Sequence, residues 1–214
     1  MFFQNQNLRH GLKKQRQIKH NNLIDSEGSQ VDYYPNWLPF KLSLKLYDRL
    51  VDTLPLEVMN VVVGGRTLPQ PRLTSWHGDP GKAYTYSGLT VVPDPWTEEL
   101  TFLRKELKDF LGYEFNSVLV NYYRDGSDYI GAHSDNEEGL GPTPDNIVIA
   151  SVSLGEARNF TLRHKQTKKI YSTDLQFGSL LVMAGKTQKF YTHEVSRCKA
   201  ITKGRLNLTY RIIT

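Results

Sequence analysis

His133, Asp135 and His193 are the residues of this chain with the clearest potential for metal chemistry. His133 and Asp135 stand in a segment that we expect to be extended, where side chains at positions i and i+2 point in the same direction. A third ligand must come from elsewhere, and His193 lies at the end of a predicted strand over residues 190–193. Two histidines and one carboxylate on one face of a metal leave its other positions open for a bidentate cosubstrate and dioxygen. The three residues therefore predict a non-haem iron(II) site.

A His-x-Asp pair alone is more often a surface pair than a pair of ligands, but the last predicted strand, over residues 205–212, favours the metal site. This strand alternates strictly, with one polar and one apolar face. The polar face carries Arg205, Asn207, Thr209 and Arg211. An ordinary explanation is a strand with one face in the core and one in water.

A second predicted strand, over residues 118–123, has a similar polar face with Asn121 and Tyr123. Two strands then offer a basic, hydrogen-bonding set beside the candidate metal. A small dicarboxylate that chelates iron at one end needs an arginine at its other end, because the guanidinium fork matches a carboxylate.

The elements that must position these residues are many short strands and two helices. Apolar spacing predicts one helix over residues 43–53, and a second that begins with Asp94 as N-cap and Pro95 as first residue and ends at Gly112. The remaining strands are predicted over residues 147–152, 160–163, 169–171 and 179–183. Closely spaced strands favour a double-sheet structure such as a jelly roll, an α+β fold that is mainly β, with the helices packed on one outer face.

Composition limits the class of protein and its partners. The net charge is +5 and the pI about 9.2, which favours an anionic partner such as nucleic acid. Residues 1–33 are basic and lack apolar periodicity, so we expect a disordered tail before one domain over residues 34–214. This tail would be either a basic arm on a phosphate backbone or a solvated segment without a fixed role.

A single cysteine, Cys198, excludes an internal disulfide, and no apolar stretch is long enough to span a membrane. The first residues do not resemble a signal peptide. We therefore expect an intracellular protein, nuclear if its source is eukaryotic and otherwise cytoplasmic.

The chain resembles the AlkB family of Fe(II)/2-oxoglutarate-dependent nucleic-acid dealkylases, and most of all its DNA-repair members. The resemblance covers residues 34–214. It is carried by Asn121-x-Tyr123, the run from Arg124 to His133-x-Asp135, the segments 149–155 and 158–165, His193, and Arg205-x-Asn-Leu-Thr-x-Arg211.

The resemblance implies a double-stranded β-helix, that is, a jelly-roll core. We also expect the protein to be a monomer. It implies that His133, Asp135 and His193 bind Fe(II). It implies 2-oxoglutarate binding by Asn121, Tyr123, Arg205, Asn207, Thr209 and Arg211, with Arg205 on the distal carboxylate. The implied reaction is oxidative demethylation of N-alkylated bases such as 1-methyladenine and 3-methylcytosine in DNA, with RNA as an open alternative. Dioxygen is consumed, 2-oxoglutarate is decarboxylated and formaldehyde is released.

The resemblance also assigns a base pocket to the segment 84–88, with Tyr84, Tyr86 and Ser87 as lining residues. An enzyme that works on a base must take it out of the stack, and aromatic faces suit the flipped base. The ordinary explanation for the two tyrosines is an aromatic strand in the core. Asn136 stands where similar repair enzymes often have an acid that meets the exocyclic amine of the base, and Glu137 is the candidate to take over part of that role.

A predicted hairpin with Gly64 and Gly65 at its tight turn matches the segment that carries a bulky wedge in relatives that act on duplexes. Here the tip offers no side chain to insert, while Arg66 is available for a phosphate. We therefore expect single strands to be better substrates than duplexes.

Two other functions compete with nucleic-acid dealkylation. An oxygenase of the same fold that hydroxylates protein side chains would share the iron and cosubstrate residues but would need neither the basic charge nor Tyr84 and Tyr86. A non-catalytic nucleic-acid-binding module would need no metal site, and the complete set of metal and cosubstrate residues argues against it.

Overall fold

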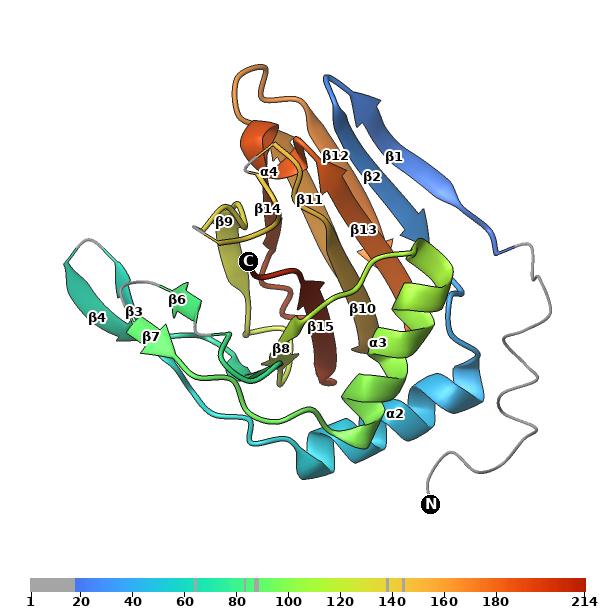
Figure 1. Ribbon diagram of the computed structural model, residues 1–214, viewed down its shortest axis with the longest axis vertical. Helices are drawn as coiled ribbons and strands as arrows, with labels where there is room; N and C mark the ends of the chain where they lie inside the picture. Colours follow the sequence, from blue (N-terminus) through green and yellow to red (C-terminus); the bar gives the residue numbers. More distant parts are fainter. Residues whose placement is uncertain (1–17, 64, 83, 87–88, 138, 144) are drawn as a thin grey trace.

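The computed structural model describes residues 18–214 apart from 64, 83, 87–88, 138 and 144, and only the backbone at 62–63, 84–86 and 89–91. Two antiparallel sheets form its body (Figure 1). In spatial order, the larger sheet contains β1 (Asn21–Ser26), β2 (Ser29–Tyr34), β13 (Ser179–Gly185), β10 (Ile149–Gly155), β15 (Arg205–Arg211), β8 (Ser117–Tyr123) and β5 (Leu73–Gly78). The smaller sheet contains β12 (Ile170–Leu175), β11 (Arg158–His164), β14 (Tyr191–Val195) and β9 (Ile130–His133).

Alternate residues of the strands of the larger sheet contribute to two different cores, one on each face. In β15, Leu206, Leu208 and Tyr210 pack against the helices, together with alternate residues of β10. The opposite face of the sheet, with Ile149, Leu181 and Met183, packs against the smaller sheet. This two-sheet arrangement is the predicted jelly roll.

Two helices cover the outer face of the larger sheet, α2 (Phe40–Thr53) and α3 (Glu98–Leu111), as predicted (Figure 1). Gly112 ends α3 in the left-handed conformation at φ 79°, which glycine adopts without strain. The predicted start of this helix is wrong. Thr97 is the N-cap, and its side chain accepts a hydrogen bond from the Leu100 amide, because the backbone of Asp94 instead pairs with Trp76 and Gly78 of β5.

The boundary predicted at residue 34 is also wrong, because residues 21–34 form β1 and β2 of the larger sheet. β2 pairs with β13 along six residues, from Leu180 opposite Tyr34 to Gly185 opposite Ser29. Val31 and Tyr33 alternate into the space between the sheets. The sequence pattern of a strand is weak here, because polar residues at the sheet edge interrupt the alternation of apolar side chains. Residues 1–17 lie outside the described part of the chain.

Two small hairpins project from the same side of the molecule (Figure 1). The first joins β3 (Asn60–Val63) to β4 (Arg66–Pro69), with Val63 paired to Arg66, so the predicted hairpin is present. The second joins β6 (Tyr84–Tyr86) to β7 (Leu89–Val91). A short helix, α4 (Thr187–Phe190), precedes β14, so the strand predicted to start at Phe190 begins at Tyr191 and continues past His193. In the described residues, no helix has the length and apolarity needed to cross a membrane.

Candidate metal centre and cosubstrate pocket

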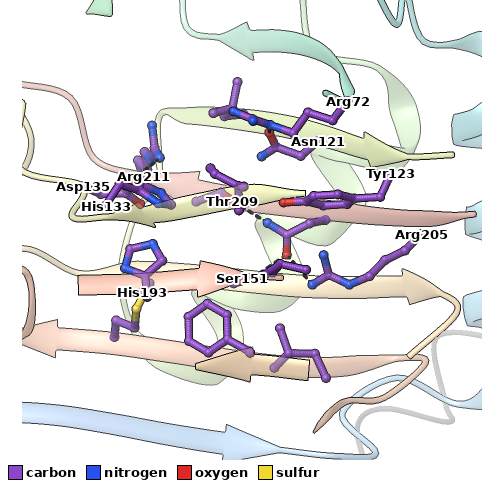
Figure 2. A pocket seen from close by; sticks show the side chains of 17 residues that line it. Arg72, Asn121, Tyr123, His133, Asp135, Ser151, His193, Arg205, Thr209 and Arg211 are labelled. Atoms are coloured by element: carbon purple, nitrogen blue, oxygen red, sulfur yellow. Dashed lines mark hydrogen bonds and ion pairs between the residues drawn. The ribbon is translucent and has the colours of Figure 1, made fainter. Parts of the chain in front are cut away.

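The structure brings His133, Asp135 and His193 together, as predicted from their types and spacing. One potential ligand atom from each residue lies within 4.8 Å of those of the other two. His133 ends β9 and His193 lies in β14, and the two residues are directly paired between these strands. Asp135 follows β9 by two residues, so all three side chains meet at one end of the space between the sheets (Figure 2).

The orientation of the His133 ring and the protonation state of His193 suit metal binding. The ring nitrogen Nδ1 of His133 lies 2.8 Å from the carbonyl oxygen of Gly131, so Nδ1 donates and Nε2 keeps its lone pair for a metal. Burial lowers the pKa of His193 to about 3. His193 is therefore neutral near pH 7, as a ligand must be.

Asp135 is held as a carboxylate. Burial alone would raise its pKa, but the positive charge of the nearby Arg211 outweighs burial and keeps the pKa of Asp135 far below its usual range. Nη2 of Arg211 lies 2.9 Å from Oδ1 of Asp135. The amide of Asp135 also donates to Oε1 of Gln188 at 3.0 Å, which fixes the backbone beside the carboxylate.

Arg205 lies at the other end of the same pocket from the metal triad (Figure 2). Its side chain is 1% exposed, and burial lowers the pKa of its guanidinium to about 10, so the group remains charged near neutral pH. Its Nε and Nη1 make no hydrogen bond within the described residues, and Asp135 is the only carboxylate in the pocket lining described. A buried cation with two open donors fits the distal carboxylate of 2-oxoglutarate.

Asn207 organises the polar floor between the two ends. Its Oδ1 accepts from Ser151 Oγ at 2.7 Å and from Arg205 Nη2 at 3.1 Å, and its Nδ2 donates to Thr209 Oγ1 at 2.7 Å. Arg205 Nη2 also donates to Ser153 Oγ at 2.9 Å. Asn207 thus orients Arg205 and Thr209, in addition to lining the pocket.

The polar faces predicted for residues 118–123 and 205–212 line the pocket. The alternative explanation, that these faces point into water, is wrong. The lining described consists of Arg72, Leu119, Asn121, Tyr123, Ile130, His133, Asp135, Ser151, Phe160, Leu175, Met183, His193, Val195, Arg205, Asn207, Thr209 and Arg211.

Sequence reasoning missed three polar residues of this site. Ser151 and Ser153 alternate with apolar residues in β10, so the same period-2 signal that marked β15 was present for them. Arg72 is buried and donates from Nε to Oδ1 of Asn121 at 2.6 Å, which orients that amide. Arg72 lies in a connection before β5, and no periodic pattern marks it in the sequence.

The residues predicted to contact a base lie outside this lining or outside the described residues. Asn136 is exposed and Glu137 is half-buried, and Oε2 of Glu137 is a buried acceptor that makes no hydrogen bond within the described residues. Gly65 and Arg66 are exposed at the first hairpin. Gly64 and Ser87 lie outside the described residues, and Tyr84 and Tyr86 are described only by their backbone, in β6.

The chain matches the family model of the 2OG-Fe(II) oxygenase superfamily over residues 30–211. It is 35% identical over 195 residues to alpha-ketoglutarate-dependent dioxygenase alkB homolog 3 of Rattus norvegicus, covering 86% of this chain and 64% of that relative. It is 40% identical over 161 residues to DNA oxidative demethylase ALKBH2 of Mus musculus, covering 72% of this chain and 66% of that relative. The chain thus spans a little under two thirds of the length of both.

The fold matches the solved structure of OsALKBH1 with a TM-score of 0.61 at 22% identity, over 85% of this chain and 97% of that chain. This likeness supports the two-sheet architecture. The family match extends from β2 to the end of β15, and so includes both ends of the pocket. By sequence, fold and the fit of its His-Asp-His cluster to iron, the chain belongs to the 2OG-Fe(II) oxygenase superfamily, among the AlkB-type proteins.

Proposed function

We propose that this protein is an Fe(II)- and 2-oxoglutarate-dependent dioxygenase that removes alkyl groups from bases of nucleic acid. The observation that carries the proposal is the polarity of the pocket: a His-Asp-His cluster at one end and a buried arginine with open donors at the other. A dicarboxylate that chelates a metal through one end and meets an arginine at the other matches this arrangement.

In this proposal, His133, Asp135 and His193 hold Fe(II), and Arg205 binds the distal carboxylate of 2-oxoglutarate. Asn121 and Tyr123 line the pocket between these ends and hydrogen-bond to the cosubstrate. When bound, the iron and 2-oxoglutarate supply the oxidising power for hydroxylation with dioxygen. The protein contributes orientation and a pocket whose ionisable groups are largely buried.

The proposed substrate is an N-methylated base, such as 1-methyladenine or 3-methylcytosine, in DNA. RNA is a second class of substrate to be tested. The names of the two relatives, a DNA oxidative demethylase and an AlkB homologue, support this class. Tyr84, Tyr86 and Ser87 would line the base pocket, and Asn136 and Glu137 would meet polar groups of the base. The open acceptor on Glu137 suits an exocyclic amine. The exposed Gly65 and Arg66, with Gly64, would lie against the phosphate backbone.

The test is incubation of the purified protein with Fe(II), ascorbate, 2-oxoglutarate and oligonucleotides that contain one methylated base. Mass spectrometry should show loss of the methyl group, with formaldehyde released in equal amount and succinate formed in at least that amount. The His193→Ala variant is the control and should be inactive while keeping the circular dichroism spectrum of the parent. Turnover of methylated oligonucleotide by this variant would show that the third ligand is misassigned. Hydroxylation of protein side chains without any action on oligonucleotides would overturn the substrate class.

A further inference from the structure

Arg158 is a buried cation that the functions described above do not use. It opens β11 and its side chain is 1% exposed, although arginine is almost never fully buried unless it is paired. Among the ion pairs of the described residues, none includes Arg158. Burying a charge without a carboxylate partner costs free energy, so an apolar residue at this position would give a more stable fold.

The guanidinium of Arg158 is instead solvated by backbone carbonyls from two separate segments. Nη1 donates to the carbonyl of Asp125 at 3.1 Å, and Nη2 donates to the carbonyls of Asp128 at 2.8 Å and Ser196 at 2.7 Å. A planar fork of donors makes several directional contacts at once, which a lysine ammonium does less well.

Both segments border strands that carry candidate metal ligands. Asp125 and Asp128 precede β9, which ends in His133, and Ser196 directly follows β14, which contains His193. These two strands pair only at His193 with His133 and at Val195 with Ile130, with an irregularity between the pairs. β14 is also paired with β11 along four residues, including His193 opposite Leu162, whereas β9 is the edge strand of this sheet. The position of His133 relative to His193 therefore depends on how the start of β9 is held against the end of β14.

Arg158 also supports the cosubstrate end of the pocket. Its guanidinium carbon lies 5.5 Å from the centroid of the Tyr123 ring, and that of Arg205 lies 5.3 Å from the same centroid. The Tyr123 ring therefore lies between Arg158 and Arg205, the residue predicted to bind the distal carboxylate of 2-oxoglutarate. A single buried side chain thus contacts elements from both ends of the pocket.

We propose that Arg158 is a positioning residue for the metal centre, which ties the ends of β9 and β14 together so that His133 and His193 converge on one ion. This inference rests on the proposed iron site. It assigns Arg158 no contact with metal, cosubstrate or substrate. Its effect acts through the backbone of the two strands.

The test measures Mn(II) affinity from the electron paramagnetic resonance signal of the free ion, which needs no turnover. Arg158→Gln should weaken Mn(II) binding by about tenfold, the lower range for residues that orient metal ligands. Arg158→Lys should give a smaller loss. The matched control is Arg163→Gln, which removes an exposed arginine from the same strand and should leave Mn(II) affinity unchanged. Guanidinium ion added to an Arg158→Ala variant should restore part of the affinity, because it refills the vacated site.

Three results would count against this assignment. If folded Arg158→Gln binds Mn(II) as tightly as the wild type, Arg158 is not needed to position the ends of β9 and β14. Failure of the Gln, Lys and Ala variants to fold, with and without guanidinium ion, would show a role in folding alone. Absence of Mn(II) binding by the wild-type protein would refute the proposed metal site itself, and is therefore distinguishable from the first result.

Discussion

Arg211 and Asp135 form a buried ion pair at the metal end of the pocket, with 2.9 Å between Nη2 and Oδ1. Arg211 is the last residue of β15 in the larger sheet, and Asp135 follows β9 of the smaller sheet. The pair therefore joins the two sheets at the site. It also keeps the carboxylate ionised in a position where burial alone would favour the neutral acid.

Replacing Arg211 with glutamine should destabilise the metal-free protein by about 3–5 kcal/mol, because the buried Asp135 carboxylate loses its cation. A bound divalent metal would supply the missing positive charge. Mn(II) should therefore raise the melting temperature of Arg211→Gln by more than it raises that of the wild type. Differential scanning calorimetry with and without Mn(II) measures both shifts. Equal shifts would show that Arg211 does not compensate the charge of Asp135.

Replacing Arg205 with lysine should raise the 2-oxoglutarate concentration needed for half-maximal turnover by about 10- to 100-fold. Lysine keeps the charge but loses the fork, and a hydrogen bond to a charged group is worth about 1.5–3 kcal/mol. The maximal rate should change much less, since the metal end is untouched. Arg197→Lys is the control, because Arg197 packs on Tyr129 outside the pocket lining. An unchanged cosubstrate dependence in Arg205→Lys would refute the assignment.

Replacing Tyr86 with alanine should reduce activity on a methylated oligonucleotide by about tenfold or more, since base–aromatic stacking is worth about 1–3 kcal/mol. Decarboxylation of 2-oxoglutarate in the absence of oligonucleotide should persist, because no residue of the metal or cosubstrate site is altered. Measuring succinate with and without oligonucleotide separates the two activities. Loss of both would indicate that Tyr86 is needed for folding, and Tyr113→Ala, at an exposed tyrosine, controls for nonspecific effects.

A methylated base should be repaired faster in a single strand than in the annealed duplex. The predicted turn at Gly64 and Gly65 has no side chain to replace a flipped base, so opening a duplex costs a few kcal/mol without compensation. Initial rates on one oligonucleotide, alone and annealed, measure the preference. Faster repair of the duplex, lost on replacing Val63 with alanine, would show that Val63 acts as the wedge.

The parts of the site that could be predicted from sequence are those whose side chains repeat with the period of a strand. Arg205, Asn207 and Thr209 were predicted from alternation alone to share a face, and they line the pocket. The convergence of His133 with His193 could not be derived from any local pattern, because it depends on the pairing of β9 with β14. Residue type and family resemblance suggested it.

The features that escaped prediction depend on contacts between distant segments. Arg72 reaches Asn121 from a connection without periodicity, and Arg158 is recognisable only once its three carbonyl partners are placed. The start of α3 was misplaced because Asp94, a good N-cap by type, uses its backbone to pair with β5. Local preference competed there with sheet formation, and the sheet prevailed.

The pairing of β2 with β13 has a consequence for how the domain can be delimited. β13 is an interior strand only because β1 and β2 cover it, and its residues Leu181 and Met183 belong to the core between the sheets. A chain shortened to begin at residue 34 would leave the backbone donors and acceptors of β13 open along a hydrophobic edge, which is a template for strand exchange between molecules. β1 and β2 form the edge of the larger sheet opposite β5. By covering β13 they therefore disfavour self-association through its backbone.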